Sequence, residues 1–199
     1  MLDSEGAANR GYGGLRSWMR DAETIWRDNA VNARMTLIGR WNYHNELAAQ
    51  LPAPGIRVVY AKAGTLPASC ILRNSRTVID HKLYWTTPRD EMEATFLIAI
   101  LNSETARART AHYQSRGQWG ARDFDKVMFN LPIPRFDPEQ ELHRDLSATA
   151  EVAERVAAQV TLPENIRFQR ARSLIRTVLA DTGIAASIDA LVARLLDGN

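Results

Sequence analysis

The sequence is poor in cysteine, in long apolar runs and in excess charge, and each absence narrows the class of protein. Cys70 is the single cysteine, so no internal disulfide can form and a reducing compartment is favoured. No apolar run approaches the roughly 20 residues that a membrane-spanning helix needs. The N-terminal segment has neither the basic nor the apolar region of a targeting peptide. We therefore expect a cytoplasmic protein without membrane contact.

Motifs for catalysis and for metal binding are also missing. The four histidines are far apart, with no second ligand at metal spacing. The chain has no phosphate-binding glycine loop and no nucleophile elbow. Asp80-His81-Lys82 has the form of one part of a metal-dependent nuclease site, but no acidic residue precedes it between Leu47 and Ile79 to share the cation. We therefore expect a non-catalytic chain that holds no metal and no cofactor.

The charge that is present is unevenly distributed along the chain. Net charge is only +2, but most of the 25 basic residues are arginines, whose planar guanidinium suits phosphate and guanine. Two stretches, Leu47–Ile79 and Thr105–Arg122, contain basic residues and no acid. Each is either a solvated surface or a surface that contacts a polyanion.

Hydrophobic periodicity predicts an α+β fold, with a small antiparallel β-sheet, packed helices and a helical C-terminal extension. Residues 57–62, 68–73 and 77–85 alternate with a period of two between turn residues, which predicts three strands in a meander. Helical spacing of apolar residues predicts helices at 15–33, 41–51, 88–101, 103–113, 121–129, 142–160, 164–181 and 184–196. The apolar stripes of the last helices are expected to be core.

Three domains are expected from these elements. Residues 1–54 combine a mobile N-terminal segment with helices, 55–136 form the α+β domain, and 137–199 form the helical extension. Within the α+β domain, Gln114–Phe136 consists of a glycine-rich loop, a short helix and the extended segment Leu131-Pro-Ile-Pro134. A basic, aromatic loop between structured elements indicates contact with a polyanion.

Four phrases occur in order between about Arg57 and Glu154. They are VVYAKAGTLPASCIL, VIDHKLYW, EATFLIAILNS and QSRGQWGARDFDKVMFNLPIPRFDP, followed by Leu142-His143. In order and spacing they resemble the C-terminal region of bacterial N6-adenine DNA methylases of the restriction-modification type. The resemblance implies a target-recognition domain that follows the catalytic domain, with an arrangement similar to that of specificity subunits.

The motifs of the catalytic domain of that family are absent. The chain has no Asn-Pro dipeptide, and therefore no Asn-Pro-Pro-aromatic motif, and it has no glycine-rich S-adenosylmethionine loop. The resemblance thus implies a fragment or subunit of a DNA adenine-N6 methyltransferase, with S-adenosylmethionine bound by a separate catalytic domain in cis or in trans. That domain would receive the flipped adenine. This chain would bind double-stranded DNA and orient it.

The expected DNA contacts come from basic and amide side chains of the acid-free stretches and the glycine-rich loop. The candidates are Arg57, Lys62, Arg73, Asn74, Arg76, Arg107, Arg109, Gln114, Arg116, Gln118, Arg122 and Lys126. Arg and Gln suit bidentate contacts with guanine and adenine. For Arg116 and Arg122 the alternatives are phosphate contacts and internal pairing with Asp123 or Asp125.

A second function remains open at this point. The chain is alternatively a protein–protein interaction or dimerisation module of the same system, without independent DNA binding. The heptad pattern of residues 142–160 and the helix with Trp18 and Trp26 would then bind a catalytic partner or a second copy of the chain. A homodimer would form through the C-terminal helices.

Overall fold

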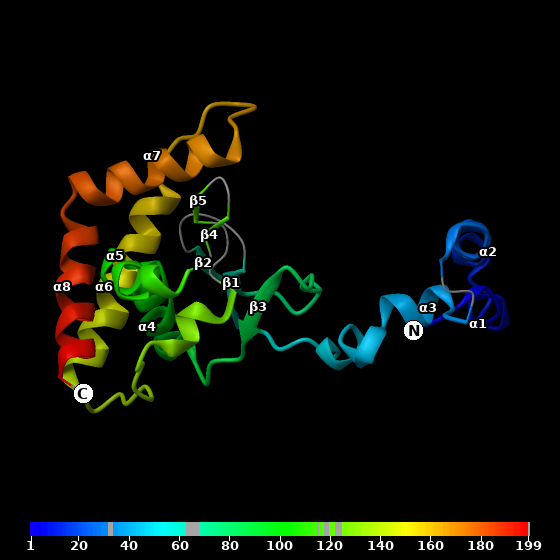
Figure 1. Ribbon diagram of the computed structural model, residues 1–199, viewed down its shortest axis with the longest axis horizontal. Helices are drawn as coiled ribbons and strands as arrows, with labels where there is room; N and C mark the ends of the chain where they lie inside the picture. The colour runs from blue at the N-terminus through cyan, green and yellow to red at the C-terminus, as the bar shows by residue number, and fades with distance from the viewer. Residues whose placement is uncertain (32–33, 63–67, 115, 118–119, 122–124, 199) are drawn as a thin grey trace. The chain divides into compact units, whose positions relative to one another are not determined.

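A computed structural model describes the chain except for residues 32–33, 63–67, 115, 118–119, 122–124 and 199 (Figure 1). The chain divides into two compact units. The smaller consists of Met1–Ala53 with Arg76–Val78, and the larger of Pro54–Ser75 with Ile79–Asn199. A small antiparallel sheet, several helices and a helical C-terminal extension confirm the predicted α+β fold class.

The smaller unit is helical from close to its N-terminus. Its elements are α1 (Ser4–Asn9), α2 (Gly13–Asn29), α3 (Leu37–Trp41) and two 3₁₀ turns (Tyr43–Asn45 and Ala48–Gln50). The segment up to Gly14, which was expected to be mobile, contains α1, and two sets of hydrogen bonds stabilise this helix. Asp3 Oδ1 accepts from the Gly6 N–H at 2.7 Å and caps the helix. The Ser4 N–H and hydroxyl donate to the Glu23 carboxylate on α2, at 3.0 and 2.5 Å.

Aromatic side chains join α2 to α3 in the smaller unit. The Trp26 indole N–H donates to the Met35 carbonyl at 2.7 Å. Trp18 stacks on Trp41 with ring centroids 5.9 Å apart, yet Trp18 remains 58% exposed. Met19 is the buried residue of α2. The apolar face of α2 is therefore only partly covered by its own unit.

The sheet of the larger unit has its first strand in the middle. It consists of β1 (Arg57–Ala61), β2 (Ser69–Leu72) and β3 (Leu83–Thr86), in the order β2-β1-β3. Val59 of β1 lies opposite Cys70 on one side and Trp85 on the other. The expected meander is wrong, because β3 pairs with β1 rather than with β2. β1 has its first four residues buried, as expected for a strand that is covered on both faces.

The third strand is also shorter than residues 77–85. A turn precedes it, in which the Asp80 carbonyl accepts from the Leu83 N–H at 3.0 Å. The Asp80 side chain accepts from the Lys82 N–H at 2.9 Å. An Asx-type hydrogen bond of this kind competes with strand pairing, so β3 begins only at Leu83.

Five helices of the larger unit follow the strands. They are α4 (Glu91–Asn102), α5 (Glu104–Thr110), α6 (Glu141–Ala158), α7 (Phe168–Asp181) and α8 (Ile184–Asp197). Ser103 caps α5, as the sequence predicts, by accepting from the Ala106 N–H. Asp90, expected within the first turn of a helix from 88, instead caps α4 by accepting from the Glu93 N–H. Gly183 separates α7 from α8 with a φ of 75°, which favours glycine. Figure 1 shows α4, α6 and α8 side by side, with α7 running across their end.

The segment from Gln114 to Phe136 is less helical than predicted. β4 (Arg116–Gly117) pairs with β5 (Gly120–Ala121), and a 3₁₀ helix spans Asp125–Asn130. The short helix expected at 121–129 therefore begins as a strand and ends as 3₁₀, and its residues 122–124 lie outside the described residues. Residues 131–136 lie in no helix or strand, as the prolines favour, and the Ile133 N–H donates to the Leu131 carbonyl at 2.8 Å in a tight turn.

One hydrophobic core holds the larger unit together. It includes Tyr60 of β1, Phe96 of α4, Phe136 of the segment 131–136, Leu146 of α6 and Val192 of α8. Phe96 lies 5.2 Å from Phe136, between ring centroids. The segments 55–136 and 137–199 thus share a core, because α6 and α8 cover α4.

Candidate nucleic-acid interface

Arg57, the first candidate on the sheet, is completely buried. Its Nη2 donates to the Asn74 carbonyl at 2.7 Å, and its Cζ lies 6.0 Å from the centroid of the Trp85 ring. A guanidinium with 0% exposure does not reach a phosphate in this conformation. The expectation of a DNA contact is corrected here: Arg57 starts the central strand, where both faces are covered.

Arg73 lies at the surface but is held by two carboxylates from distant helices. Nε donates to Glu91 of α4 at 3.0 Å, and Nη1 and Nη2 donate to Glu154 of α6 at 2.6 and 2.8 Å. Hydrogen bonds to Glu154, and then to Glu91, raise the pKa of Arg73, while Arg73 lowers the pKa of Glu154. The stretch around Arg73 lacks acids in the sequence, but the fold supplies them. A DNA contact of Arg73 stays a prediction, and it would require the guanidinium to exchange these carboxylates for phosphate.

The two candidate arginines of α5 are paired in the same way. Arg107 forms an ion pair with Glu104, one turn earlier, and Arg109 forms one with Asp197 at the end of α8. Arg109 Nη1 also donates to the Leu196 carbonyl at 3.2 Å. Hydrogen bonding to Arg107 lowers the pKa of Glu104, and Glu104 raises the pKa of Arg107. Both guanidinium groups thus stabilise the fold locally.

The remaining candidates occupy several different environments. Lys62 lies with Nζ 4.1 Å from the centroid of the Tyr84 ring, and Lys126 and Asn74 are exposed. Gln114 is only 8% exposed, so its expected role in reading a base edge is not supported in this conformation. Arg76 is exposed and belongs to the smaller unit.

The last three candidates fall on or beside the parts that the structure leaves out. The backbone of Arg116 lies in β4. Gln118 and Arg122 lie outside the described residues. Their DNA contacts, and the alternative pairing with Asp123 or Asp125, stay predictions.

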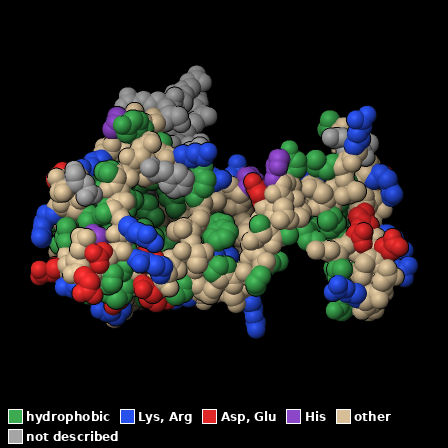
Figure 2. Space-filling view, turned by 90° about the horizontal axis from the view of Figure 1, so that it is seen from below, with side chains coloured by type: hydrophobic (Ala, Val, Ile, Leu, Met, Phe, Trp, Pro, Cys, Tyr) green, Lys and Arg blue, Asp and Glu red, His purple; other side chains and the backbone are tan. Residues whose placement is uncertain are grey.

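The surface of the larger unit is therefore mixed in charge. On the face that Figure 2 shows, Lys and Arg side chains alternate with Asp and Glu rather than forming one basic area. Three of the candidate arginines are in ion pairs and Arg57 is buried. For Arg73, Arg107 and Arg109, the acid-free stretches of the sequence therefore do not correspond to acid-free surroundings in the fold.

A third basic, acid-free stretch was missed. Residues Asn165–Ala180 contain Arg167, Arg170, Arg172 and Arg176 without an acid, and most of them form α7. Arg172 and Arg176 are spaced by four residues, so they lie on one face of the helix. The criterion that selected the first two stretches would have found this one, but the apolar stripe of α7 was assigned to core packing instead.

The pairing of Arg73 with Glu154 makes a testable contribution to stability. We expect a coupling of up to about 1 kcal/mol in a double-mutant cycle of Arg73→Gln and Glu154→Gln, because exposed pairs are screened by solvent. Because the fold lowers the pKa of Glu154, the pair contributes fully to the unfolding free energy at pH values above the ordinary glutamate pKa of 4.5. This contribution is lost as the pH falls through the lowered pKa. Urea denaturation of the four proteins from neutral to acidic pH measures both effects.

The pair Arg155–Glu151 on α6 is the matched control. Its atoms are 3.9 Å apart and its side chains are 65% and 46% exposed, compared with 42% and 41% for Arg73 and Glu154. We expect no measurable coupling in the control cycle. Equal coupling energies in the two cycles would contradict a stabilising role of the Arg73–Glu154 ion pair. A coupling energy for Arg73 and Glu154 that persists in acid would contradict it as well.

Two searches of the described residues gave no candidates. No group of three or more His, Cys, Asp or Glu side chains among them is placed to hold a metal ion. Among the same residues, no helix combines the length and the apolar character needed to cross a membrane. What the geometry defines is an α+β unit with a helical extension. Comparison with models of protein families, with curated proteins and with solved structures found no match to this chain.

Proposed function

We propose that this chain is the non-catalytic target-recognition region of a restriction-modification type DNA adenine-N6 methyltransferase. It binds duplex DNA and orients it for a separate S-adenosylmethionine-dependent catalytic domain, supplied in cis or in trans. One observation supports this proposal above the others: each phrase that carries the resemblance contributes described residues to one core of the larger unit.

The contacts within that core come from each of the phrases. Tyr60 comes from the first phrase and Tyr84 from the second, and their rings stack with centroids 6.0 Å apart. Phe96 comes from the third phrase and Phe136 from the fourth. His143, just after the fourth phrase, lies 4.8 Å from Phe96, and its Nδ1 accepts from the Asp137 N–H at 3.0 Å. The phrases therefore describe one structural unit, as expected of a shared domain.

Lysines at one end of the sheet are the best-placed cations for phosphate contacts. The Lys62 N–H donates to the Lys82 carbonyl at 3.2 Å, so the two residues are adjacent where β1 ends and β3 begins. Lys82 is exposed and Lys62 is half-buried. Neither forms an ion pair with another described residue. Lysine side chains are long enough to contact a DNA backbone from this position.

A salt-dependent titration of the full chain with duplex DNA tests the proposal. We expect binding that weakens with salt and is readily measured at about 50 mM. In Lys62→Gln/Lys82→Gln the slope of log affinity against log salt should fall by about 1.8, because each neutralised phosphate contributes about 0.9. Fluorescence anisotropy with a labelled duplex measures both quantities.

Arg16→Gln/Arg20→Gln is the matched control, since it removes the same charge from two exposed positions of α2 in the smaller unit. Its slope should equal that of the unmodified chain. No binding at low salt would refute the proposed function. Equal slopes for the two double variants would refute the sheet end as the contact surface.

The interaction module is the second candidate. It is favoured by the exposed Trp18–Trp41 stack and by the ion pairing of Arg73, Arg107 and Arg109, which removes charge from a DNA-facing surface. Exposed aromatic residues are enriched where proteins bind one another. Absence of DNA binding at low salt, together with a concentration-dependent molar mass in light scattering, would favour this function.

A further inference from the structure

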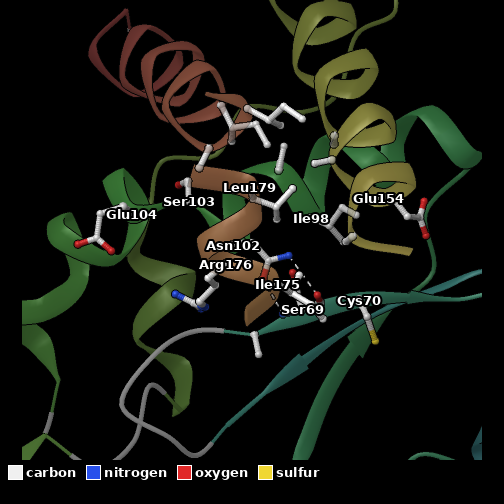
Figure 3. Close-up of a pocket in the computed structure, with 18 of the residues that line it drawn as sticks. Ser69, Cys70, Ile98, Asn102, Ser103, Glu104, Glu154, Ile175, Arg176 and Leu179 are labelled. Atoms are coloured by element: carbon white, nitrogen blue, oxygen red, sulfur yellow. Dashed lines mark hydrogen bonds between the residues drawn. The ribbon is translucent and has the colours of Figure 1, made fainter. Parts of the chain in front are cut away.

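A cavity of about 610 Å³ opens in the larger unit between β2 and the helices α4, α6, α7 and α8 (Figure 3). Its apolar wall includes Ile98 of α4, Ala153 of α6, Ile175 and Leu179 of α7, and Ile188 of α8. Volumes of about 300–1,000 Å³ with a mostly apolar lining are typical of small-molecule sites. The proposed DNA-binding function makes no use of this cavity.

The cavity exists because short side chains face a helix that stands away from the core. The walls from α4 and α6 present Ala99, Ala150, Ala153 and Ala157. These side chains are too short to fill the space under α7. No residue of α7 is buried, although its apolar stripe was expected to be core. The stripe is half-buried instead, since Ile175 and Leu179 line the open space.

The carboxylates of the cavity wall are already satisfied within the chain. Glu104 and Glu154 each form an ion pair with an arginine, and their side chains remain 54% and 41% exposed. Asp189 Oδ1 accepts from a backbone N–H of α5 at 3.0 Å. Figure 3 shows Glu104 and Glu154 at opposite sides of the view, with Ile98 and Leu179 between them. A ligand in the middle of the cavity therefore meets apolar side chains.

The two arginines of the wall also interact within the chain. Arg172 Cζ lies 5.3 Å from the centroid of the Phe168 ring. Arg176 is acted on electrostatically by Glu104. Because the carboxylates and the guanidinium groups of the described wall all have interactions inside the protein, the wall favours neither an anion nor a cation. Such a cavity selects a ligand without charge, since burying an unpaired charge is costly.

The shape of the cavity favours a small molecule over a segment of another protein. One strand and four helices contribute to its wall, so it is concave on several sides. A helix of a partner would need a long groove with exposed apolar side chains along it. A small molecule needs only a hollow in which most of its surface is covered.

We propose that this cavity binds a small, uncharged and mostly apolar molecule, of the size of a medium-chain alcohol or a bicyclic aromatic compound. One side of the ligand lies against the alanine side chains of α4 and α6, and the other against Ile175 and Leu179 of α7. Transfer of the ligand's apolar surface from water to this wall supplies the affinity. The bound ligand also gives α7 packing contacts that its half-buried stripe lacks. The site is independent of the sheet end proposed for DNA.

Titration of the full chain with N-phenyl-1-naphthylamine, an uncharged compound whose fluorescence rises in apolar surroundings, tests the proposal. We expect saturable binding of one molecule per chain. The affinity should not change with added sodium chloride, because screening acts on charges. The alcohol 1-decanol should displace the probe at a lower concentration than decanoate, since the carboxylate would have to leave water.

Two pairs of alanine variants locate the binding in the cavity. Ala153→Leu fills the cavity from α6 and should weaken binding of the probe by about tenfold or more. Ala148→Leu is the matched control, because it makes the same change at an exposed position of the same helix, outside the cavity wall. Its affinity should equal that of the unmodified chain. Ala157→Leu, on the wall, and Ala158→Leu, exposed beside it, form the second pair and decide the matter if far-UV circular dichroism shows that Ala153→Leu does not fold.

Saturable binding that the wall variants weaken and the exposed variants leave unchanged would support the proposal. Non-saturable binding, equal affinities of wall and exposed variants, an affinity that falls with salt, or stronger displacement by decanoate than by decanol would each overturn it. If a second copy of the chain occupies the cavity instead, probe binding should weaken as the chain concentration rises and light scattering should detect dimers. That result would also overturn the proposal.

Discussion

Phe96→Ala is expected to destabilise the larger unit by about 3–5 kcal/mol, the range observed for truncating a buried phenylalanine. Phe96 is 0% exposed and lies between Phe136 at 5.2 Å and His143 at 4.8 Å, measured between ring centroids. The substitution removes the ring contacts of α4 with Phe136 and with His143 of α6. A domain of this size is stable by only about 5–15 kcal/mol, so the substitution would remove a large part of the unfolding free energy.

Urea denaturation followed by far-UV circular dichroism measures this loss. Phe168→Ala is the matched control, because Phe168 is a phenylalanine in the same unit that is 67% exposed. Its contact with Arg172, 5.3 Å from ring centroid to Cζ, limits the expected loss to about 1 kcal/mol. Equal losses for the two variants would contradict the assignment of Phe96 to the core.

Arg57→Ala is expected to lower the unfolding free energy by about 2–4 kcal/mol, through the loss of a buried charged hydrogen bond and of packing. The substitution removes the donor to the Asn74 carbonyl and the contact with the Trp85 ring. Because the guanidinium is buried, the salt slope of DNA binding should not change. Measuring both the unfolding free energy and the salt slope of DNA binding for this variant therefore distinguishes an internal role of Arg57 from the DNA contact that the sequence suggested.

Arg57→Met and Arg155→Ala are the controls for this prediction. Methionine keeps much of the apolar volume and removes the buried charge, so it should cost less than alanine. Arg155 has a side chain that is 65% exposed on α6, so Arg155→Ala should change stability by less than about 0.5 kcal/mol. An Arg57→Ala chain with unaltered stability and a reduced salt slope would show that Arg57 reaches the DNA backbone.

Elements whose causes lie within a few residues could be predicted from the sequence. The cap at Ser103 begins α5 where the pattern places it, because its side chain accepts from the backbone N–H of Ala106. Asp90 caps α4 in the same way, slightly after the predicted start at 88. Gly183 separates α7 from α8 for the same local reason. β1 and β2 also lie where the period of two indicates. The predicted start of β3 was wrong because the Asp80 turn competes with the strand.

The candidate site could be predicted less well, because charge was judged along the chain rather than in space. The stretch that contains Arg73 has no acid in the sequence, but Glu154 reaches it from 81 positions away. Asp197 reaches Arg109 from 88 positions away. The cavity beneath α7 could not be predicted from hydrophobic periodicity either. An apolar stripe shows which side of a helix faces inward, but it does not show how closely that side packs.

By itself the sequence determined the fold class, the limits of α6 and α8 to within two residues, and the positions of β1 and β2, since all of these follow from neighbouring residues. Tertiary structure alone decided that β3 pairs with β1, that Arg57 is internal, and that Arg73 and Arg109 meet carboxylates. It also placed Arg172 and Arg176 at an open apolar cavity. The physical reason is the range of the interactions: caps and turns act over a few residues, whereas ion pairs, burial and cavities depend on which distant surfaces the fold brings together.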